Sequence, residues 1–418
     1  MSSSWDTLSV GEMLKDGYLL HHMDGNHGAL YPRASEFVEA GVPYLTANAI
    51  ISGQVDWTQA KYLTPERAGK LQKGFAKDGD VLFAHNATVG PVALLRTDEE
   101  QVVLSTTLTY YRCNPNKLDN RYLKHALGSS LFSRQYERIM GQSTRNQVPI
   151  TTQRKLHVPL PPLAEQKKIA EILSCWDRAI ELLEKLKIQL SYLARATSYQ
   201  LYSAKFKSNP RRIATDLGNF PEGWTVKRLK DVCSINKSSL SASTPEDEEF
   251  YYVDLSAVKS RNVAVPVEKM RFAALPSRAR RRAQIGDILM ATVRPNLKGF
   301  AQISSTKTPL VVSTGFAVLE THRKQDAKYL LNYLFSHLME RQVNSLIVGS
   351  NYPALNSNDV GNLLVPWPES DSIREMIGNQ IDLIYSQVTT LSAVIELIER
   401  QKKGLMQKLL TGKIRVKV

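Results

Sequence analysis

The sequence has little cysteine and no long apolar run. Its three cysteines, Cys113, Cys175 and Cys233, lie far apart and form no CxxC pair, which excludes a disulfide scaffold and a cysteine-based zinc site. No stretch of about 18 apolar residues is present to span a bilayer, and the first residues, MSSSWDTLSVGEM, lack the basic and apolar regions of a signal peptide. We therefore expect a reduced, cytoplasmic protein without a membrane partner.

Acidic residues are fewer than basic ones. The 418 residues include 54 Lys+Arg and 40 Asp+Glu, a formal net charge of +14. Such an excess attracts phosphate backbones and anionic lipid alike, and the lack of a membrane segment favours nucleic acid. The apolar fraction of 43% supports a buried core rather than a disordered chain, and the length fits two or three domains of about 150 residues each.

Motifs of the common DNA-modifying and nucleotide-hydrolysing enzymes are missing as well. No glycine-rich methyl-donor loop precedes Asn351-Tyr352-Pro353, which only partly matches an NPPY motif. Gly412-Lys413 lacks the earlier glycine and the Ser or Thr of a phosphate-binding loop. Glu165-Gln166-Lys167 has no Pro-Asp pair upstream and fits a helix start better than a nuclease site. We predict no catalytic residue and no cofactor in this chain.

One histidine cluster is a candidate metal site. His21, His22, Asp24 and His27 lie within HHMDGNHG at irregular spacing. The interpretation that we favour is a solvated polar loop, so we predict no metal.

The chain contains two copies of one pattern, 207 residues apart. Gly79-Asp80 recurs as Gly286-Asp287, and Tyr122-Leu123 recurs as Tyr329-Leu330. The other matches at this offset are Tyr44 with Tyr251, Thr106-Thr107 with Ser313-Thr314, Gln135 with Gln342, and Val158-Pro159-Leu160-Pro161 with Val365-Pro366-Trp367-Pro368. A shared register over this length indicates an internal duplication.

Each copy has the same predicted anatomy. Short β-type runs at 81–83 and 102–104, and at 288–290 and 310–312, are followed by one helical segment, at 121–140 and at 328–346. A proline-rich stop, VPLPP or VPWP, then ends the domain. The expected segments are a first recognition domain at 1–160, a central long helix at 161–208, a second recognition domain at 209–368, a distal long helix at 369–412 and a basic tail at 413–418.

Both long helices carry coiled-coil patterning. The first is expected to begin near Leu163 and to end at Asn209-Pro210, and the second to begin near Ser370 or Asp371 and to end at Thr411-Gly412. The predicted seam residues are Ile169, Leu173, Trp176, Ile180, Leu183 and Leu190 in the first helix, and Ile377, Ile381, Ile384, Val388, Leu391, Ile395 and Ile398 in the second. At about 40 residues, or roughly 60 Å, each helix is longer than its own domain can cover. We predict that the helices pack on each other in antiparallel fashion; two separate amphipathic helices are the alternative.

Several segments of the chain resemble a known protein family. VPLPPLAEQKKIAEILSCWDRAIELLEKLK (158–187) and LIERQKKGLMQKLLTGKIRV (397–416) resemble the central and distal helical regions of the specificity subunits of type I restriction-modification systems. FPEGWTVKRLKDV (220–232) and GDIL (286–289) resemble the start and an internal strand of the family's second target recognition domain. Two departures stand out: the second copy reads VPWPESDSIREMIG without an EQ-type helix start, and the first copy has only Trp5 in place of EGW.

The resemblance implies an α+β fold with two pseudo-two-fold-related mixed α/β recognition domains separated by the two antiparallel helices. It implies a non-catalytic subunit that selects double-stranded DNA for two modification (methyltransferase) subunits and, where present, for restriction/translocase subunits. S-adenosylmethionine is then expected on the modification subunit, and ATP and magnesium on the restriction subunit. Because the two domains differ in sequence, the expected target is asymmetric and bipartite. A coiled-coil adaptor that binds only proteins is the alternative function.

Two loops per copy are candidates for reading bases, because Arg, Lys, Asn and Gln can each make two hydrogen bonds to one base. They contain His85, Asn86, Thr88, Thr144, Arg145, Asn146 and Gln147 in the first copy, and Arg294, Asn296, Lys298, Asn351 and Tyr352 in the second. Asn, Ser and Thr also form turns, which is the structural alternative. A run of four arginines is a candidate for phosphate contacts or for a solvated face: Arg278, Arg280, Arg281 and Arg282. The basic tail is a candidate for contact with DNA or with an acidic partner protein.

Overall fold

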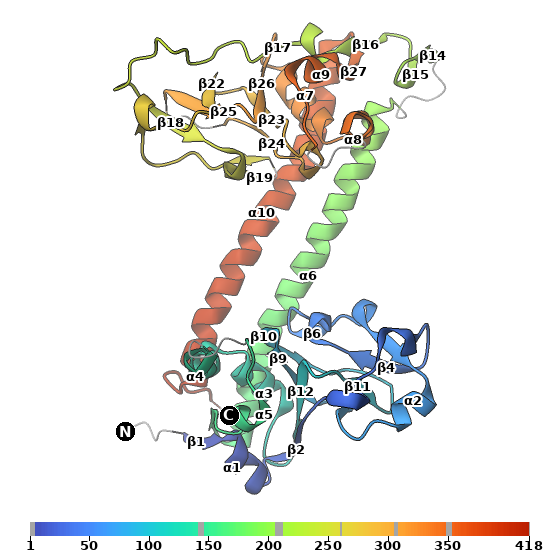
Figure 1. Cartoon of the computed structure of the whole chain (residues 1–418), viewed down its shortest axis with the longest axis vertical. Helices are drawn as coiled ribbons and strands as arrows, with labels where there is room; N and C mark the ends of the chain where they lie inside the picture. The colour runs from blue at the N-terminus through green and yellow to red at the C-terminus, as the bar shows by residue number, and fades with distance from the viewer. Residues whose placement is uncertain are drawn as a thin grey trace. The chain divides into compact units, whose positions relative to one another are not determined.

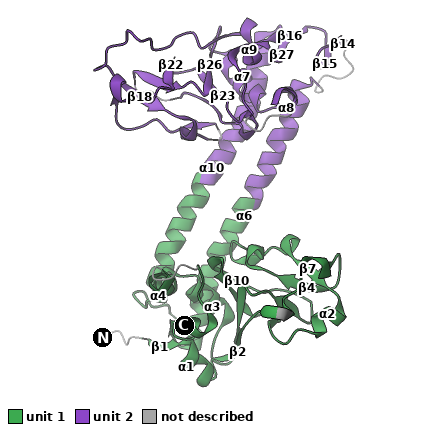
Figure 2. Cartoon of the chain, in the orientation of Figure 1, with its two compact units in different colours: residues 1–184, 393–418 green, residues 185–392 purple. Residues whose placement is uncertain are grey.

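The computed structural model describes residues 5–140, 146–204, 212–259, 261–304, 308–347 and 353–417. The chain divides into two compact units, residues 1–184 with 393–418 and residues 185–392 (Figure 2). Each unit contains one globular domain and a part of each long helix (Figure 1). The edges predicted for the five sequence segments stay a prediction.

The first unit is built on two sheets. An antiparallel sheet has the order β10-β9-β12-β2, and a mixed sheet, in which β4 and β11 are parallel, has the order β3-β7-β4-β11-β8. The strands are β1 Asp6–Ser9, β2 Leu19–Asp24, β3 Phe37–Val38, β4 Val42–Leu45, β5 Ile50–Ile51, β6 Gln54–Val55, β7 Lys61–Leu63, β8 Phe75–Ala76, β9 Val81–Asn86, β10 Thr88–Leu94, β11 Val102–Leu104, β12 Leu108–Cys113 and β13 His157–Leu160. The short helices are α1 Val10–Lys15, α2 Pro65–Gly69, α3 Asn120–Leu127, α4 Ser130–Met140 and α5 Ile150–Gln153.

The second unit repeats this plan. Its sheets have the orders β17-β26-β23-β24 and β21-β18-β25-β22, with β18 and β25 parallel. The strands are β14 Arg212–Thr215, β15 Gly218–Pro221, β16 Trp224–Arg228, β17 Cys233–Ile235, β18 Glu249–Val253, β19 Val258–Lys259, β20 Asn262–Val263, β21 Met270–Arg271, β22 Ala279–Ala283, β23 Ile288–Ala291, β24 Phe300–Gln302, β25 Leu310–Ser313, β26 Phe316–Thr321 and β27 Leu364–Pro368. The short helices are α7 Asp326–Leu334, α8 His337–Ile347 and α9 Ser357–Asn362. The fold is α+β, as predicted.

Strand β9 shows why these short apolar runs become buried strands. Alternate residues of a strand point to opposite faces, and Val81 and Phe83 lie in one core cluster while Leu82 and Ala84 lie in another. The turn before the strand needs Gly79, whose φ is +83°, and is closed by Asp80, whose carboxylate accepts the Lys77 N–H at 2.8 Å. Gly286 and Asp287 make the same turn before β23, with φ at +94° and the Gln284 N–H at 2.9 Å.

The repeat register is 207 at some of the matched positions and 208 at others. Leu108 lies opposite Ala84, and Phe316 lies opposite Ala291, so β12 and β26 are offset by 208 residues. Tyr44 and Val103 pair and lie in one small core cluster, and Tyr252 and Val311 pair and lie in the matching cluster of the second unit, so this strand pair is also offset by 208. The expected matches of Tyr44 with Tyr251 and of Thr106-Thr107 with Ser313-Thr314 are therefore wrong by one residue, because connecting loops of the two copies differ in length.

The helical segment and the proline stop also differ from the prediction in detail. Each predicted segment is two helices, α3 with α4 and α7 with α8. Each proline stop is an edge strand, since β13 pairs with β1 and β27 pairs with β16. The match of Gln135 with Gln342 is confirmed in structure: Gln135 bonds both backbone groups of His157, at 2.8 and 2.9 Å, and Gln342 those of Leu364, at 2.7 and 2.9 Å.

The long helices are α6, Leu163–Tyr202, and α10, Asp371–Leu410. In the first unit they run antiparallel, because Glu165 pairs with Arg415 and Asp177 pairs with Lys402. In the second unit the end of α6 shares a core with the start of α10, through Tyr202, Ile377 and Ile381. Of the predicted seam residues, Ile169, Leu173, Ile377, Ile381 and Ile395 are buried and the others are half-buried. Their role as a coiled-coil seam stays a prediction. The first helix ends at Tyr202, earlier than the expected end at Asn209-Pro210, and a turn follows at Ser203 and Ala204. Asn209 and Pro210 themselves lie outside the described residues.

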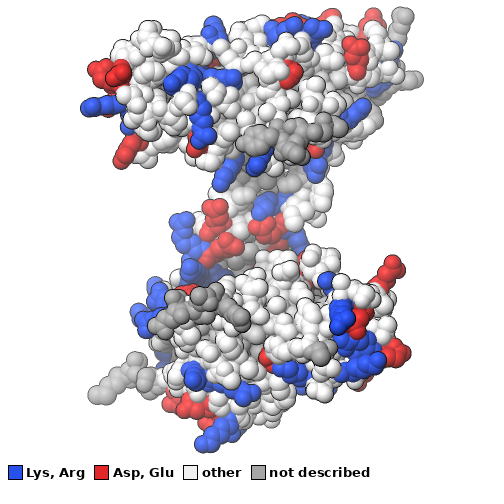
Figure 3. Space-filling view, viewed as in Figure 1, with Lys and Arg blue, Asp and Glu red and all other residues white. Residues whose placement is uncertain are grey.

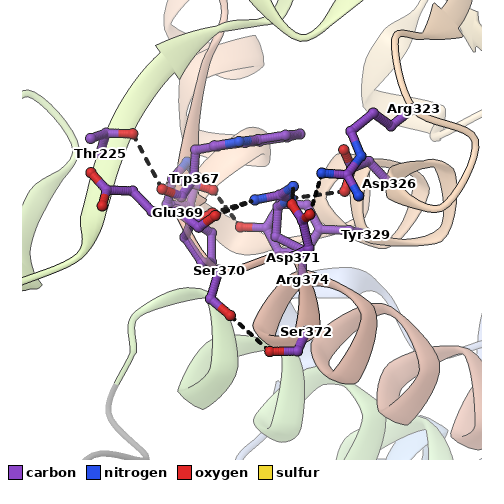
Figure 4. Close-up of polar contacts among 12 residues, drawn as sticks. Thr225, Arg323, Asp326, Tyr329, Trp367, Glu369, Ser370, Asp371, Ser372 and Arg374 are labelled. Carbon is purple, nitrogen blue, oxygen red and sulfur yellow. Dashed lines mark hydrogen bonds and ion pairs between the residues drawn. The ribbon is translucent and has the colours of Figure 1, made fainter.

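The start of α10 is fixed by a buried arginine (Figure 4). Arg374 is 3% exposed and donates to the Asp326 carboxylate at 2.8 Å and to the Pro368 carbonyl at 2.6 Å. Its guanidinium lies 4.6 Å from the centre of the Trp367 ring and also pairs with Asp371. These contacts join strand β27 to helices α7 and α10.

Among the described residues, α10 is the one helix long and apolar enough to cross a membrane by length and composition. This corrects the expectation that the sequence holds no such stretch. Its Ile377, Ile381 and Leu409 are buried against other parts of the chain, whereas only 11% of the apolar window is buried.

Candidate nucleic-acid interface

The two predicted loops of the first copy meet at the end of β9. The Val148 N–H donates to the His85 carbonyl at 2.8 Å, and the Ala87 N–H donates to the Asn146 carbonyl at 3.1 Å. Asn86 lies opposite Gln147 in an antiparallel bridge. The side-chain amide of Asn146 donates to the Ala87 carbonyl at 2.8 Å. The two loops therefore form one structure.

The second copy repeats this structure with other side chains. The Leu355 N–H donates to the Thr292 carbonyl at 2.9 Å, and the Arg294 N–H donates to the Pro353 carbonyl at 2.8 Å. Val293 lies opposite Ala354. Each of these residues follows its counterpart by 207 positions. Ala87 and Arg294, which correspond, also share a left-handed backbone, with φ at +63° and +49°.

The predicted base-reading residues differ in exposure. Thr88, Asn146, Arg294 and Asn296 are exposed, while Asn86 and Gln147 are half-buried. The Lys298 ammonium is held 3.0 Å from the Glu340 carboxylate, so it is committed to an ion pair within the unit. Thr144, Arg145, Asn351 and Tyr352 lie outside the described residues. The roles of all these residues toward DNA stay predictions.

His85 does not have the position expected of a base-reading residue. Its side chain is 5% exposed, because β9 continues through it. Burial lowers the pKa of its imidazole, so the ring is neutral at physiological pH. His85 supports the loop pair through its backbone.

The buried Gln153 holds the loop pair in place. This residue was not predicted from the sequence. The Gln153 amide donates to the Val148 carbonyl at 2.8 Å, and its oxygen accepts from Tyr111 at 2.7 Å and from Thr109 at 3.0 Å. His22 lies 3.2 Å from the same oxygen. These partners come from different elements, so no local spacing in the sequence could have identified them.

The HHMDGNHG segment is mainly a strand rather than the solvated loop that we expected. His21, His22 and Asp24 belong to β2, and His22 is 2% exposed. Burial lowers the pKa of His22 to about 4. Asp24 pairs with Lys73 at 2.5 Å and with His27 at 2.6 Å. In the part of the chain that the structure describes, no three His, Cys, Asp or Glu residues are grouped to hold a metal.

The arginine run is strand β22 with Arg278 just before it. Adjacent residues of a strand point to opposite faces, so Arg281 points away from Arg280 and Arg282. The role of the four arginines toward phosphate stays a prediction. Arg280 and Arg282 lie over the rings of Phe272 and Phe250, at 5.1 and 5.4 Å, whereas Arg281 is half-buried and Arg278 is exposed. Figure 3 shows Lys and Arg spread over the visible face of each unit among acidic residues.

Part of the basic tail is bound to its own chain. The Arg415 guanidinium makes two hydrogen bonds to Glu165, each of 2.7 Å, and lies over the Trp5 ring at 5.3 Å. The partners expected for the tail were DNA or an acidic protein. Pairing with Glu165 of the same chain was not expected, because Glu165 lies 250 positions away in the sequence. Lys413 and Lys417 are exposed.

Comparison with known proteins identifies the family. The type I restriction modification DNA specificity domain matches this chain twice, over residues 26–192 and 221–406. Two relatives from Methanocaldococcus jannaschii cover nearly the whole chain. The putative MjaX specificity subunit is 25% identical over 90% of this chain and 88% of its own, and the MjaVIII specificity subunit is 24% identical over 91% of each.

Solved structures agree on the fold. The type I restriction-modification system S subunit from M. genitalium has a TM-score of 0.58 at 15% identity and covers 98% of this chain and 97% of its own. A chain from a structure on complex assembly and conformational transition of the type I R-M system has a TM-score of 0.51 at 18% identity and covers 99% of both chains. The family match excludes the adaptor alternative and makes this chain the non-catalytic component. The chain belongs to the family of type I restriction-modification DNA specificity subunits and carries two recognition domains.

Proposed function

We propose that each domain reads one half of an asymmetric, bipartite target in double-stranded DNA. The observation that carries this proposal is the loop pair, which is built twice on the same backbone bonds but with different side chains: Ala87 corresponds to Arg294, and Asn146 to Pro353. Different donors and acceptors at one framework position select different bases. Two unlike loop pairs therefore select two unlike half-sites.

The proposal assigns two tasks to α6 and α10. Each is continuous over 40 residues and contributes to both units, so the pair is suited to setting the length of the unread spacer. Apolar side chains outside the seam are exposed on both helices, among them Leu182, Leu186, Leu193, Leu383 and Leu397. Exposed apolar groups of this number favour a protein partner, and we assign them to the docking of two modification subunits.

The chemistry would then be supplied by the partners. S-adenosylmethionine would bind the modification subunits, and ATP and magnesium would bind restriction/translocase subunits where the system has them. The complex would act on DNA in the cytoplasm.

Lengthening the helices tests the spacer assignment. Seven residues inserted between Glu184 and Lys185, and seven between Ser392 and Ala393, keep the heptad pattern and add about 10 Å. At about 3.4 Å per base pair, the spacer should grow by about three base pairs while both half-sites stay the same. An insertion in α6 alone is the control and should abolish methylation. An unchanged spacer in the double insertion would contradict the proposal.

A further inference from the structure

The second unit carries an exposed leucine on a strained turn. Pro295–Leu297 is a 3-10 turn flanked by Arg294 and Lys298, both left-handed, with φ at +49° and +52°. Leu297 is 70% exposed. Left-handed conformations of residues other than glycine persist where the surrounding structure enforces them, and two around one exposed leucine indicate that its position matters.

The turn is held on both sides. The Arg294 N–H donates to the Pro353 carbonyl at 2.8 Å, and the Lys298 ammonium pairs with Glu340 of α8 at 3.0 Å. Within the turn, the Leu297 N–H donates to the Arg294 carbonyl at 3.0 Å, and Pro295 is buried. The backbone below Leu297 is therefore fixed while its side chain stays in solvent.

Leu297 does not cover the hollow beside it. An open hollow of about 660 Å³ is lined by Leu255, Val258, Lys259, Ala291 and Leu297, among others. The leucine keeps most of its surface in solvent although apolar side chains are near. In the first unit, the chain between the paired residues Phe83 and Val92 is one residue shorter than the chain between the paired residues Met290 and Phe300. Val89 and Gly90, at the matching place, belong to β10 and are half-buried. No exposed leucine occupies this place in the described residues of the first unit.

We propose that Leu297 is an apolar wedge that inserts at one base step of the half-site read by the second unit. This rests on the proposed function, because the turn includes Arg294, which we expect to contact that half-site. Apolar side chains inserted between base pairs unstack and kink the duplex, and the ease of unstacking depends on the sequence. Leu297 would thus favour flexible steps without making a hydrogen bond to a base.

The test uses the full chain bound to its modification subunits. Target duplexes carry 2-aminopurine at successive positions of the two half-sites, and the proteins are wild type, Leu297→Ala, the conservative Leu297→Met and the exposed-residue control Ile285→Ala. The modification subunits should flip the target adenines in all four complexes. Beside those positions, we expect wild type, Leu297→Met and Ile285→Ala to raise the fluorescence at one further step of one half-site, and Leu297→Ala to lose that rise. Leu297→Ala should bind the matched duplex about tenfold more weakly than wild type does. On a duplex that is mismatched at that step, the affinities of Leu297→Ala and wild type should agree within about twofold, because the mismatch removes the cost of unstacking.

Two results would overturn the proposal. Unchanged fluorescence and affinity for Leu297→Ala would make the leucine a passive surface residue. Loss of modification-subunit binding by Leu297→Ala would assign it to a protein contact. Failure of the proposed function is distinguishable, because wild type itself would then lack a bipartite target.

Discussion

Gln166 and Arg374 make the same junction in the two halves of the chain with different chemistry. Each is the fourth residue of its long helix. The Gln166 amide donates to the Pro161 carbonyl at 2.9 Å, and its oxygen accepts the Asp119 N–H at 2.9 Å. Arg374 bonds the corresponding Pro368 carbonyl and Asp326 carboxylate. The missing EQ-type start of the second copy is thereby explained, because an arginine replaces the glutamine.

Arg374→Gln should destabilise the second unit by about 3–5 kcal/mol, because the Asp326 carboxylate, 4% exposed, is left buried without its cation. Urea unfolding measures the loss. Adding Asp326→Asn should recover much of it. Arg323→Gln is the matched control, since its ion pair with Asp371 is exposed and its loss should destabilise the unit far less than loss of the buried pair. Equal costs for the two arginine variants would contradict the assignment.

Arg294→Ala should relax base choice in one half-site only. A guanidinium that bonds one base with two hydrogen bonds discriminates by about 1–3 kcal/mol, and Ala87 at the corresponding place of the first unit has no such group. Competition binding with duplexes varied in one half-site at a time measures the effect, and Arg271→Ala, an exposed arginine of the same unit, is the control. Equal loss in both half-sites would show that the contact is not local.

DNA affinity should fall steeply with salt, because phosphate contacts release counterions in proportion to their number. Arg278→Ala should lower the slope of log affinity against log salt by about 1 if the exposed Arg278 contacts a phosphate. Lys413→Ala removes the same charge from the tail, and a lower slope for this variant as well would show that the tail also contacts phosphate. A flat plot for wild type would count against phosphate-dominated binding.

Asp287→Asn should stabilise the second unit, and more so as the pH rises. Asp80 of the first unit bonds Arg112 through both oxygens, at 2.7 and 2.9 Å, but Glu320 replaces this arginine in the second. Burial therefore raises the pKa of Asp287 to about 6 from 3.8. A carboxyl with a raised pKa favours the fold below about pH 4, and this contribution is lost as the pH rises through 6.

At pH 7, Asp287→Asn should raise the free energy of unfolding of the second unit by at most about 3 kcal/mol. At pH 4 this increase should vanish. Urea unfolding at each pH measures the difference. Asp80→Asn is the control and should destabilise the first unit, because it breaks the Arg112 pair. A pH-independent difference between Asp287→Asn and wild type would contradict this account.

The repeated framework could be predicted from the sequence because its residues bond the backbone at fixed positions. Gln135 and Gln342, or Gly79-Asp80 and Gly286-Asp287, recur since each copy needs the same bonds. The long helices could be predicted from their heptad spacing. These features depend on local pattern and repetition alone.

Contacts between distant polar residues could not be predicted. His22 and His85 are polar residues in buried strands, and Gln153 joins elements far apart in the sequence. Arg415 pairs with Glu165, which lies 250 positions earlier in the sequence. That the arginine run forms a strand, with Arg281 on the face opposite Arg280 and Arg282, was not predicted either.

The central claim is that two unlike recognition domains read two unlike half-sites. Methylation mapping of DNA from cells that express this chain with its modification subunit tests it most directly, for wild type and for Arg294→Ala. We predict two short, different sequences separated by a fixed unread spacer, with the Arg294→Ala change confined to one of them. A single uninterrupted motif, a palindrome, or a change in both sequences would contradict the account.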